Sequence, residues 1–473
     1  MTQHATALVW FRSDLRVDDN SALSAAMANH ARVTAVYCAT PGQWRRHGLS
    51  PNRVDFIRRN LACLAGELQQ LRVPLELIVV EDFSALPAQL QGLSARLGVS
   101  AVYANREYGV DELARDDQVC AALAARDIAW HCFDDSPVLT PGSVRTQGGE
   151  PFKVFTPFKR RWLQLLANRP FACERTPRPQ AGAIPVLSTF AGWRYPEATI
   201  DTAQWPAGEA AAHQRLQDFV ENGLAGYKAQ RDLPALDATS RLSPYLSLGV
   251  ISVRRCLEAA LAFNAGEWEG GNPGASCWIN ELIWREFYLH VLAAFPRVSR
   301  NRPFRAETED VPWRADDQEF ARWCAGRTGF PLVDAGMRQL VASGWMHNRV
   351  RMVTAMFLSK YLLHDWRRGE AFFMAHLVDG DLAANNGGWQ WSASTGTDAA
   401  PYFRLLSPLR QAERFDPDAD YIRRWVPELR DARTEDIFRP GSPSLLALGY
   451  PAPLVDLRVA RERALAAFAK RAA

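Results

Sequence analysis

The sequence predicts an α/β plus all-α protein, with an N-terminal doubly wound parallel sheet, a long linker and a C-terminal helical domain. The first observation is that short β-branched runs alternate with helix-like stretches over residues 1–135. The second is that the strand pattern stops by about residue 205, beyond which amphipathic helical patterns dominate. Strand–helix alternation is typical of a parallel sheet whose ligands bind at the carboxyl ends of the strands.

The expected elements follow in chain order. Five buried strands are predicted at residues 7–11, 33–39, 75–80, 100–105 and 128–133. A helix is predicted over 54–71, where apolar residues recur at helical spacing. Residues 136–204 are rich in proline and glycine and lose this period, which predicts an interdomain linker on the surface. Within the helical domain, 205–473, helices are expected over 211–224, 252–263, 275–295 and 345–366.

Composition narrows the function classes. The 473 residues are 48% hydrophobic, enough for substantial cores, and no run of ~20 apolar residues predicts a membrane span. The N-terminus lacks the pattern of a signal peptide, so we expect a cytoplasmic protein, and a monomer. Eight cysteines are scattered singly, which indicates reduced thiols and no metal site. A net charge of +3 decides little about nucleic acid, so individual arginines matter more.

The stretch DGDLAANNGGWQW, at 379–391, combines acids, amides, glycines and indoles, unlike either a core helix or a flexible linker. The chain also carries 16 tryptophans, which can be core filler, stacking platforms or a path for electrons. This mixture of residue types marks the stretch as a candidate site.

A second candidate is the predicted helix over 277–292, where Trp278, Glu281 and Arg285 share one face. The alternative is that Glu281 and Arg285 form an ordinary solvated ion pair. The tryptophans at 278 and 284 flank both charges, which is unusual for a plain solvent face.

A third candidate is a predicted helix that starts at Trp345, with Asn348, Arg349 and Met352 on the same stripe. An indole, an amide, a guanidinium and a thioether together suit a planar heteroaromatic ligand. The alternative is a core stripe with two ordinary polar exceptions.

The segment ATSRLSPYLSLG, at 238–249, offers the Thr239 and Ser240 hydroxyls before a helix, with Ser243 expected at the N-cap and Pro244 first in the helix. A helix start of this kind suits phosphate, although many bind nothing. The stretch WFRSDLRVDDN follows the first strand, where a nucleotide-type fold places its first ligand-facing loop. It has no glycine fingerprint, so ordinary dinucleotide binding there is not supported.

Together these stretches resemble the photolyase and cryptochrome family over nearly the whole chain. The resemblance is carried by WFRSDLRVDDN, TSRLSPYLSLG, WINELIWREFY, TGFPLVDAGMRQLVASGWMHNRVRM, DGDLAANNGGWQWSASTGTDAAPYFR and FDPDADYIRRWVPEL. Among relatives the chain is most similar to bacterial class I cyclobutane pyrimidine dimer photolyases. The resemblance implies an α/β antenna domain joined to a helical domain that holds FAD.

The resemblance also implies which residues contact FAD. Those matching positions around its phosphates and ribityl chain are Tyr227, Thr239, Ser240, Leu242 and Ser243. Further cofactor contacts match Trp278, Arg285, Trp345 and Asn348. Asp379 and Asp381 match acids beside the flavin ring, with Arg351 placed to pair with Asp379, and Asn385 matches the residue facing the flavin N5.

Other positions match roles in electron transfer and DNA binding. The electron chain matches Trp389, Trp366 and Trp313. The pocket for the damaged bases matches Glu281, Trp284, Met352 and Trp391, and Glu281 is expected to hydrogen-bond a base of the dimer. The phosphate contacts match Lys159, Arg231, Arg349 and Arg404. Positions for the antenna pigment match Asp111, Glu112, Ser299 and Arg300.

The implied activity is light-driven repair of cyclobutane pyrimidine dimers in duplex or single-stranded DNA. Six-four photolyases carry histidines where this chain has Asn348 and Met352, and cryptochromes replace the residue matching Asn385. The alternatives are a blue-light photoreceptor without repair activity and a plain electron-transfer flavoprotein. The expected antenna is 5,10-methenyltetrahydrofolate, while departures from the folate-binding pattern leave a deazaflavin, another flavin or an empty site open.

Overall fold

The computed structural model describes residues 6–168, 170–186 and 192–469. Outside this part lie residues 1–5, which belong to the N-terminal stretch that was searched for a signal peptide. Residues 169 and 187–191 of the predicted linker also lie outside it. The chain divides into two compact units. The first unit comprises residues 1–198, 202–225 and 240–296, and the second comprises 199–201, 226–239 and 297–473.

The first unit contains a parallel sheet of five strands in the order β3-β2-β1-β4-β5. The strands are β1 (Thr6–Phe11), β2 (Arg32–Ala39), β3 (Leu75–Val79), β4 (Val99–Asn105) and β5 (Ala129–Phe133). Each lies within one residue of its predicted position. The central strand β1 is apolar along its length and buried from Ala7 to Phe11, as expected for a strand covered on both faces. The predicted doubly wound sheet is confirmed.

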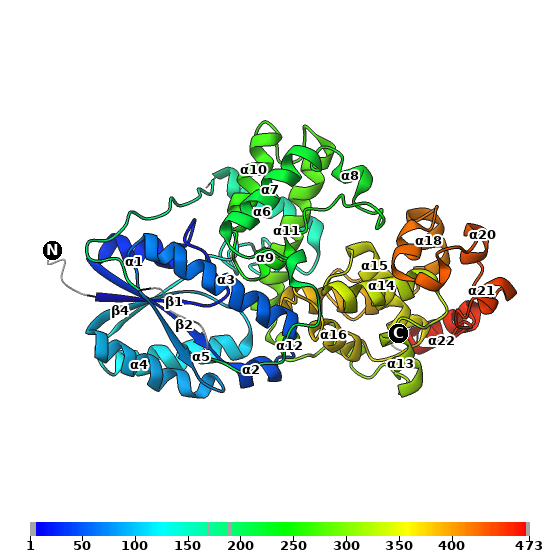
Figure 1. The fold of residues 1–473 in the computed structure, drawn as a ribbon, viewed down its shortest axis with the longest axis horizontal. Helices are drawn as coiled ribbons and strands as arrows, with labels where there is room; N and C mark the ends of the chain where they lie inside the picture. Colours follow the sequence, from blue (N-terminus) through cyan, green and yellow to red (C-terminus); the bar gives the residue numbers. More distant parts are fainter. Residues whose placement is uncertain (1–5, 169, 187–191, 470–473) are drawn as a thin grey trace. The chain divides into compact units, whose positions relative to one another are not determined.

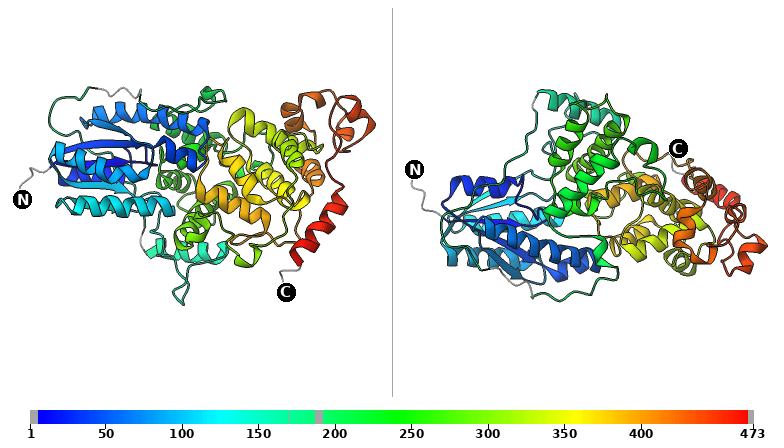
Figure 2. Two further views of the ribbon diagram at one scale, coloured as in Figure 1. Left: turned by 90° about the horizontal axis from the view of Figure 1, so that it is seen from below. Right: turned by 45° about the horizontal axis from the view of Figure 1, so that its top comes forward.

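Helices cover both faces of this sheet. Figure 1 shows α1 (Ser21–Asn29) and α3 (Pro51–Gln70) on one side, with α4 (Leu86–Leu97) and α5 (Val110–Ala124) on the other. The two views of Figure 2 show the same layers from other directions. Helix α3 begins where the Ser50 side chain accepts the Arg53 N–H, and Pro51 occupies the first helical position.

Six more α-helices are described in the first unit. They are α2 (Pro41–Arg46), α6 (Phe155–Asn168), α7 (Glu209–Asn222), α9 (Ser243–Ser247), α10 (Val253–Phe263) and α11 (Pro273–Ala294). Helix α6 lies inside the stretch predicted to be an irregular linker. Its buried residues Phe155, Phe158, Trp162 and Leu166 recur at helical spacing. This signal was in the sequence, but proline-rich and glycine-rich flanks hid it.

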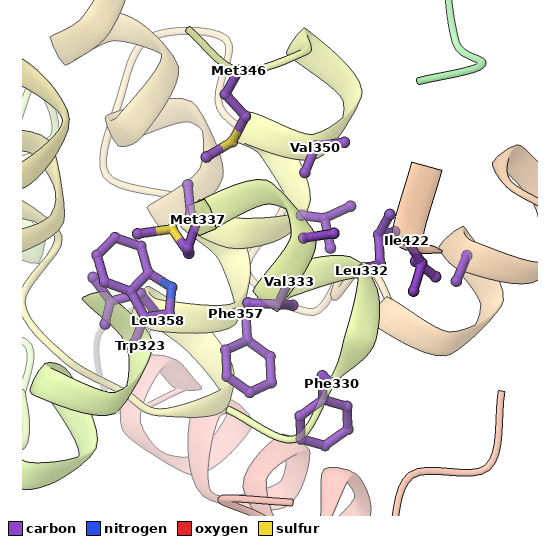
Figure 3. Packing of buried hydrophobic residues seen from close by; sticks show 14 of the residues in the cluster. Trp323, Phe330, Leu332, Val333, Met337, Met346, Val350, Phe357, Leu358 and Ile422 are labelled. Carbon is purple, nitrogen blue, oxygen red and sulfur yellow. The ribbon is translucent and has the colours of Figure 1, made fainter. Parts of the chain in front are cut away.

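The second unit is helical. It contains α8 (Tyr227–Gln230), α13 (Asp317–Cys324), α14 (Pro331–Ser343), α15 (Asn348–Met356), the π-helical turn η4 (Phe357–Tyr361), α16 (Trp366–Met374), α17 (Leu382–Ala393), α18 (Pro408–Phe415), α19 (Asp420–Trp425), α20 (Thr434–Ile437), α21 (Pro443–Ala447) and α22 (Leu457–Ala469). Its core packs side chains of α13, α14, α15 and η4, including Trp323, Met337, Val350 and Phe357 (Figure 3). Among the described residues, no helix is long and apolar enough to cross a membrane.

Two predicted helix starts were wrong. Trp345 precedes α15, because His347 adopts non-helical backbone angles and its Nδ1 accepts the Arg349 N–H as the N-cap. Ser243 is the first residue of α9 rather than its cap, so Pro244 is second. The expected continuous helix over 345–366 is also divided, because η4 ends α15 and Leu363 has a positive φ of 57°.

A buried ionic cluster joins the sheet to α10. Arg254 donates from Nε to Asp19 Oδ2 and from Nη2 to Asp135 Oδ1, both at 2.8 Å. Arg16 also pairs with Asp135. Burial alone would raise the pKa of Asp135, but Arg16 and Arg254 outweigh it and lower the pKa to about 2. Asp19 follows the central strand β1 and Asp135 follows the edge strand β5, so one arginine connects the loops after both strands to the same helix.

We expect Arg254→Met to lower the free energy of unfolding by about 3–5 kcal/mol, because it leaves two buried carboxylates short of positive charge. Arg255→Met is the matched control. Arg255 pairs with Asp18 and Glu258 but its side chain is 24% exposed, so its loss is expected to cost about 1 kcal/mol or less. Denaturant titration of both variants measures the difference. Equal costs would contradict a central role for this cluster.

Candidate functional site

In the first unit, α11 presents the predicted residues Trp278, Glu281, Trp284 and Arg285. The Trp278 side chain is buried, with its ring centroid 5.0 Å from that of Phe219. Arg285 donates to the Ser136 carbonyl and hydroxyl at 3.2 and 3.0 Å, and thereby contacts the chain just after β5. The Arg285 guanidinium therefore bonds to a distant part of the chain, unlike the guanidinium of a solvated ion pair on one helix.

Trp284 stacks flat against Phe155 of α6, with ring centroids 3.8 Å apart and planes 7° apart. Glu281 lies one turn earlier on α11 and is half-buried. The stack uses one face of the indole and fixes its orientation. The unpredicted helix α6 is therefore part of this site.

Glu286 is a residue that the sequence reasoning missed. Its side chain is buried and accepts the Val138 and Leu139 N–H groups at 2.8 and 2.7 Å, as well as the Trp162 indole N–H at 3.0 Å. Burial would raise the pKa of Glu286, but His290 and these donors lower it. Arg285 and Glu286 thus fasten residues 136–139 to α11. Only the tertiary fold reveals these partners.

In the second unit, Arg351 and Asp379 form the ion pair that the resemblance implied, with Arg351 Nη2 2.9 Å from Asp379 Oδ2. Arg351 Nε also donates to the Met346 carbonyl at 2.8 Å. The Asp379 side chain is nearly buried. Asp381 caps α17, because its Oδ1 accepts the Ala384 N–H at 2.8 Å. The two acids therefore have different tasks, one paired with arginine and one starting a helix.

Asn385 of α17 is buried and its Nδ2 donates to Glu370 Oε1 and the Glu370 carbonyl, at 3.0 and 3.2 Å. Burial raises the pKa of Glu370 to about 7, while the Asn385 bond lowers it. This carboxyl therefore titrates near neutral pH beside the amide. Glu370 was not predicted, because nothing in its local sequence distinguishes it from an ordinary helical glutamate.

The indoles of Trp389 and Trp366 lie in the buried core of the second unit, and Trp313 packs against its edge. Helix α16 approaches Trp389 closely at Gly369, where an added Cβ would lie 2.1 Å from the Trp389 Cη2. Trp366 is one turn earlier on the same helix. An unpredicted indole, Trp323, lies 6.0 Å from Trp389 between ring centroids. Aromatic rings thus fill the region around Trp389.

Two of the side chains expected around the damaged bases, Met352 and Trp391, lie on α15 and α17. Asn348 is exposed and Met352 half-buried, one turn apart on α15. Trp391 is half-buried near the end of α17. Trp345 is 8% exposed and precedes α15. An exposed amide and a partly exposed thioether on one helical face fit a binding surface better than a core stripe.

The predicted phosphate segment is divided between the units. Tyr227 and Thr239 belong to the second unit, and Tyr227 is buried under the Arg231 guanidinium, 5.4 Å from its ring centroid. Ser240, Leu242 and Ser243 belong to the first unit, in the turn before and at the start of α9.

Three of the four predicted phosphate-binding cations contact acids. Arg231 and Arg349 both approach Asp232, at 3.9 and 2.8 Å, and Lys159 lies 2.8 Å from Glu269. Arg404 is exposed on the loop after α17. A phosphate would therefore compete with Asp232 for two arginines, whereas Arg404 is open to solvent.

The antenna residues Asp111 and Glu112 lie at the start of α5. His47 joins them, with Nε2 3.0 Å from Asp111 and Nδ1 3.5 Å from Glu112. Burial raises the pKa of Glu112. His47 was not predicted. Ser299, at the end of α12 (Pro296–Ser299), and Arg300 belong to the second unit. Among the described residues, no group of acids, histidines and cysteines could hold a metal ion.

Comparison with known sequences identifies relatives along nearly all of the chain. The family described as DNA photolyase matches residues 7–180, and the FAD binding domain of DNA photolyase matches residues 278–470. The deoxyribodipyrimidine photo-lyase of Vibrio cholerae is 47% identical, covering 96% of this chain and 97% of its own. That of Escherichia coli strain K12 is 46% identical, covering 99% and 98%.

Solved structures show the same fold. A bacterial class III photolyase from Agrobacterium tumefaciens is 34% identical with a TM-score of 0.84, covering 100% of this chain and 98% of its own. A Synechocystis cryptochrome is 28% identical with a TM-score of 0.86, covering 98% and 99%. An archaeal photolyase from Sulfolobus tokodaii, described with two FAD molecules, is 28% identical with a TM-score of 0.81, covering 98% and 100%. On these matches, this chain belongs to the DNA photolyase family.

Proposed function

We propose that this protein repairs cyclobutane pyrimidine dimers in DNA by light-driven electron transfer, as a cytoplasmic monomer. The observation that carries the proposal is the 46–47% identity to two deoxyribodipyrimidine photo-lyases across at least 96% of the chain. Residues 1–135 form the antenna domain, 136–204 the linker and 205–473 the FAD domain. Duplex and single-stranded DNA that carries the dimer are both substrates.

The donor set of the second unit fits FAD. The Arg351–Asp379 pair and the Asn385 amide offer charged and neutral hydrogen-bonding groups of the kind a flavin ring requires. An added Cβ at Gly388 on α17 would meet nothing within 4 Å, so there is open space beside this helix. Asp379, Asp381 and Asn385 hold the ring. Tyr227, Thr239, Ser240, Leu242, Ser243, Trp278, Arg285, Trp345 and Asn348 hold the rest of the cofactor.

The chain's own residues orient the damaged bases. Glu281 hydrogen-bonds a dimer base, Trp284 and Trp391 contact the pyrimidines, and Met352 packs on them. The stack of Trp284 on Phe155 supports this role, because a fixed indole loses little freedom when it binds a ring. When bound, reduced FAD excited by blue light supplies the electron that opens the cyclobutane ring and then returns.

Two further sets of residues deliver electrons and bind phosphate. Trp313, Trp366 and Trp389 conduct electrons inward when the cofactor must be reduced by light. Lys159, Arg231, Arg349 and Arg404 meet the DNA backbone, an interaction that makes affinity dependent on salt. These two sets can therefore be tested independently.

The second pigment is 5,10-methenyltetrahydrofolate, bound through Asp111, Glu112, Ser299 and Arg300. The cluster of His47 with Asp111 and Glu112 supports a built polar site at the start of α5. The absorption spectrum of the purified protein, together with analysis of released pigments, tests this assignment. A released deazaflavin or second flavin would replace it.

A cryptochrome-type photoreceptor is the second candidate, favoured by the likeness to the Synechocystis cryptochrome. The sequence is less similar to that protein than to the two photo-lyases, at 28% against 46–47% identity. Repair therefore ranks first.

We expect the protein with reduced flavin to repair a thymine dimer in an oligonucleotide under blue light and not in the dark. Glu281→Gln is expected to slow repair by about tenfold or more, because it removes a charge-assisted hydrogen bond. Glu258→Gln, an exposed acid on α10, is the matched control and should repair at the wild-type rate. Tight dimer binding without light-dependent repair would favour the photoreceptor.

We expect Trp366→Phe to slow light-driven reduction of the oxidised flavin without changing repair by protein reduced chemically. Trp10→Phe is the control, since Trp10 is equally buried but lies in the sheet of the first unit. Transient absorption measures reduction, and the oligonucleotide assay measures repair. Loss of both activities only in Trp366→Phe would assign that indole to structure or substrate binding.

We expect the stability of the protein to depend on pH through the Glu370 carboxyl next to Asn385. Its pKa is raised to about 7, so between its ordinary value and 7 the folded protein holds a proton that the unfolded chain has lost. Stability should therefore fall as the pH rises through this range, and Glu370→Gln should flatten that dependence. Thermal unfolding from pH 5 to 8 measures it. An unchanged slope in the variant would contradict the assignment.

A further inference from the structure

The side chain of Lys360 lies on η4 with no exposed surface. Its Nζ donates to the backbone carbonyl of Arg404 at 3.0 Å and to that of Pro401 at 3.4 Å. No carboxylate among the described residues forms an ion pair with it. The two acceptors are thus backbone oxygens of one loop, 41 and 44 residues further along the chain.

This lysine is costly to the fold. Burial lowers the pKa of Lys360 to about 7, with a further contribution from the Arg404 charge. An ammonium group buried without a counter-charge is unfavourable, and an apolar side chain of similar length would pack at this position without that cost. A buried charge without a counter-charge does not stabilise the fold, which indicates that Lys360 serves a function.

The loop that Lys360 reaches is held at several points from its inner side. The Ser394 hydroxyl donates to the Ala400 carbonyl at 2.6 Å, and the Leu406 N–H contacts the Met356 sulfur at 3.4 Å. Leu405 and Leu406 pack against the core of the second unit. Lys360 holds the middle of the loop, between these two anchors.

The outer side of the same loop is open. Phe403 is 59% exposed, and Arg404 is exposed. The carbonyl of Arg404 is therefore fixed by a buried donor while its guanidinium faces solvent. Fixing the backbone of a residue limits the positions that its side chain can reach, which lowers the entropy cost of an ordered contact.

We propose that Lys360 is a positioning residue that holds the 401–404 loop so that Arg404 meets a DNA phosphate. This inference rests on the proposed function, because it takes the partner of Arg404 to be damaged DNA. The role belongs to the two hydrogen bonds from the Lys360 ammonium to the loop backbone.

The test compares Lys360→Met with Ser359→Ala in full-length protein containing its flavin. Ser359 is equally buried on the same turn, but its hydroxyl donates to the Ala355 carbonyl and does not contact the loop. Affinity for a duplex oligonucleotide that contains one thymine dimer is measured as a function of salt concentration. Hydrogen exchange reports on the amides of residues 402–406, and flavin absorbance reports that the fold is intact.

We expect Lys360→Met to speed exchange in the loop and to reduce the salt slope by about 0.9, the value for one phosphate contact. Arg404→Ala should reduce the slope equally, and the double variant should fall no further. Repair per bound dimer should stay at the wild-type level, since the loop acts on binding. Ser359→Ala should match wild type in every readout. If Lys360→Met does not fold, Lys360→Gln is measured instead, with the same changes expected.

The proposal is overturned if the loop exchanges as in wild type, or if Arg404→Ala lowers the slope while the Lys360 variants do not. It is also overturned if Arg404→Ala has no effect, because the loop then has no phosphate to meet. In that case, light-dependent repair by the wild-type protein would show that the proposed function survives. Failure of wild-type repair would instead reject the function itself.

Discussion

The contact of Arg254 with Asp19 and Asp135 is the constraint on which the first unit depends. The two carboxylates follow the first and last strands of the sheet in sequence, and the arginine lies more than a hundred residues later on α10. The chain that leaves Asp135 is then held by Arg285 and Glu286 of α11. A series of charged contacts thus links the sheet, the chain after β5 and α11, and so fixes the position of α11 within the first unit.

The alternation of strands and helices could be predicted because it depends on residues close in sequence. Each strand of the sheet carries its own apolar run, so its limits were found within one residue. Helix starts were less predictable. The cap of α15 depends on the backbone angles of His347, and the division after Met356 depends on a π turn that no periodic pattern marks. The Trp345 position was wrong for this reason, whereas the Ser243 position was wrong by one residue, since α9 begins at Ser243 itself.

The candidate site divides in the same way. Residues such as Asp379 and Arg351 could be named from motifs, and the structure pairs them. Their functional assignments came from family resemblance. Glu370, Glu286 and Lys360 could not be named, because each is an ordinary residue on its own helix and becomes unusual only through burial and a distant partner. Long-range partners of buried polar groups are what a single sequence does not reveal.

The surroundings of Trp389 have a consequence for the direction of charge flow. Its indole N–H is buried, and no acceptor among the described residues lies within hydrogen-bonding distance. An indole that gives up an electron becomes a much stronger acid, yet no acceptor among the described residues is placed to take this proton. If Trp389 carries electrons as proposed, the positive hole on it would stay mobile rather than be trapped by deprotonation. Trp313, proposed for the same electron chain, also has a buried N–H without a partner among the described residues, so the same reasoning applies to it.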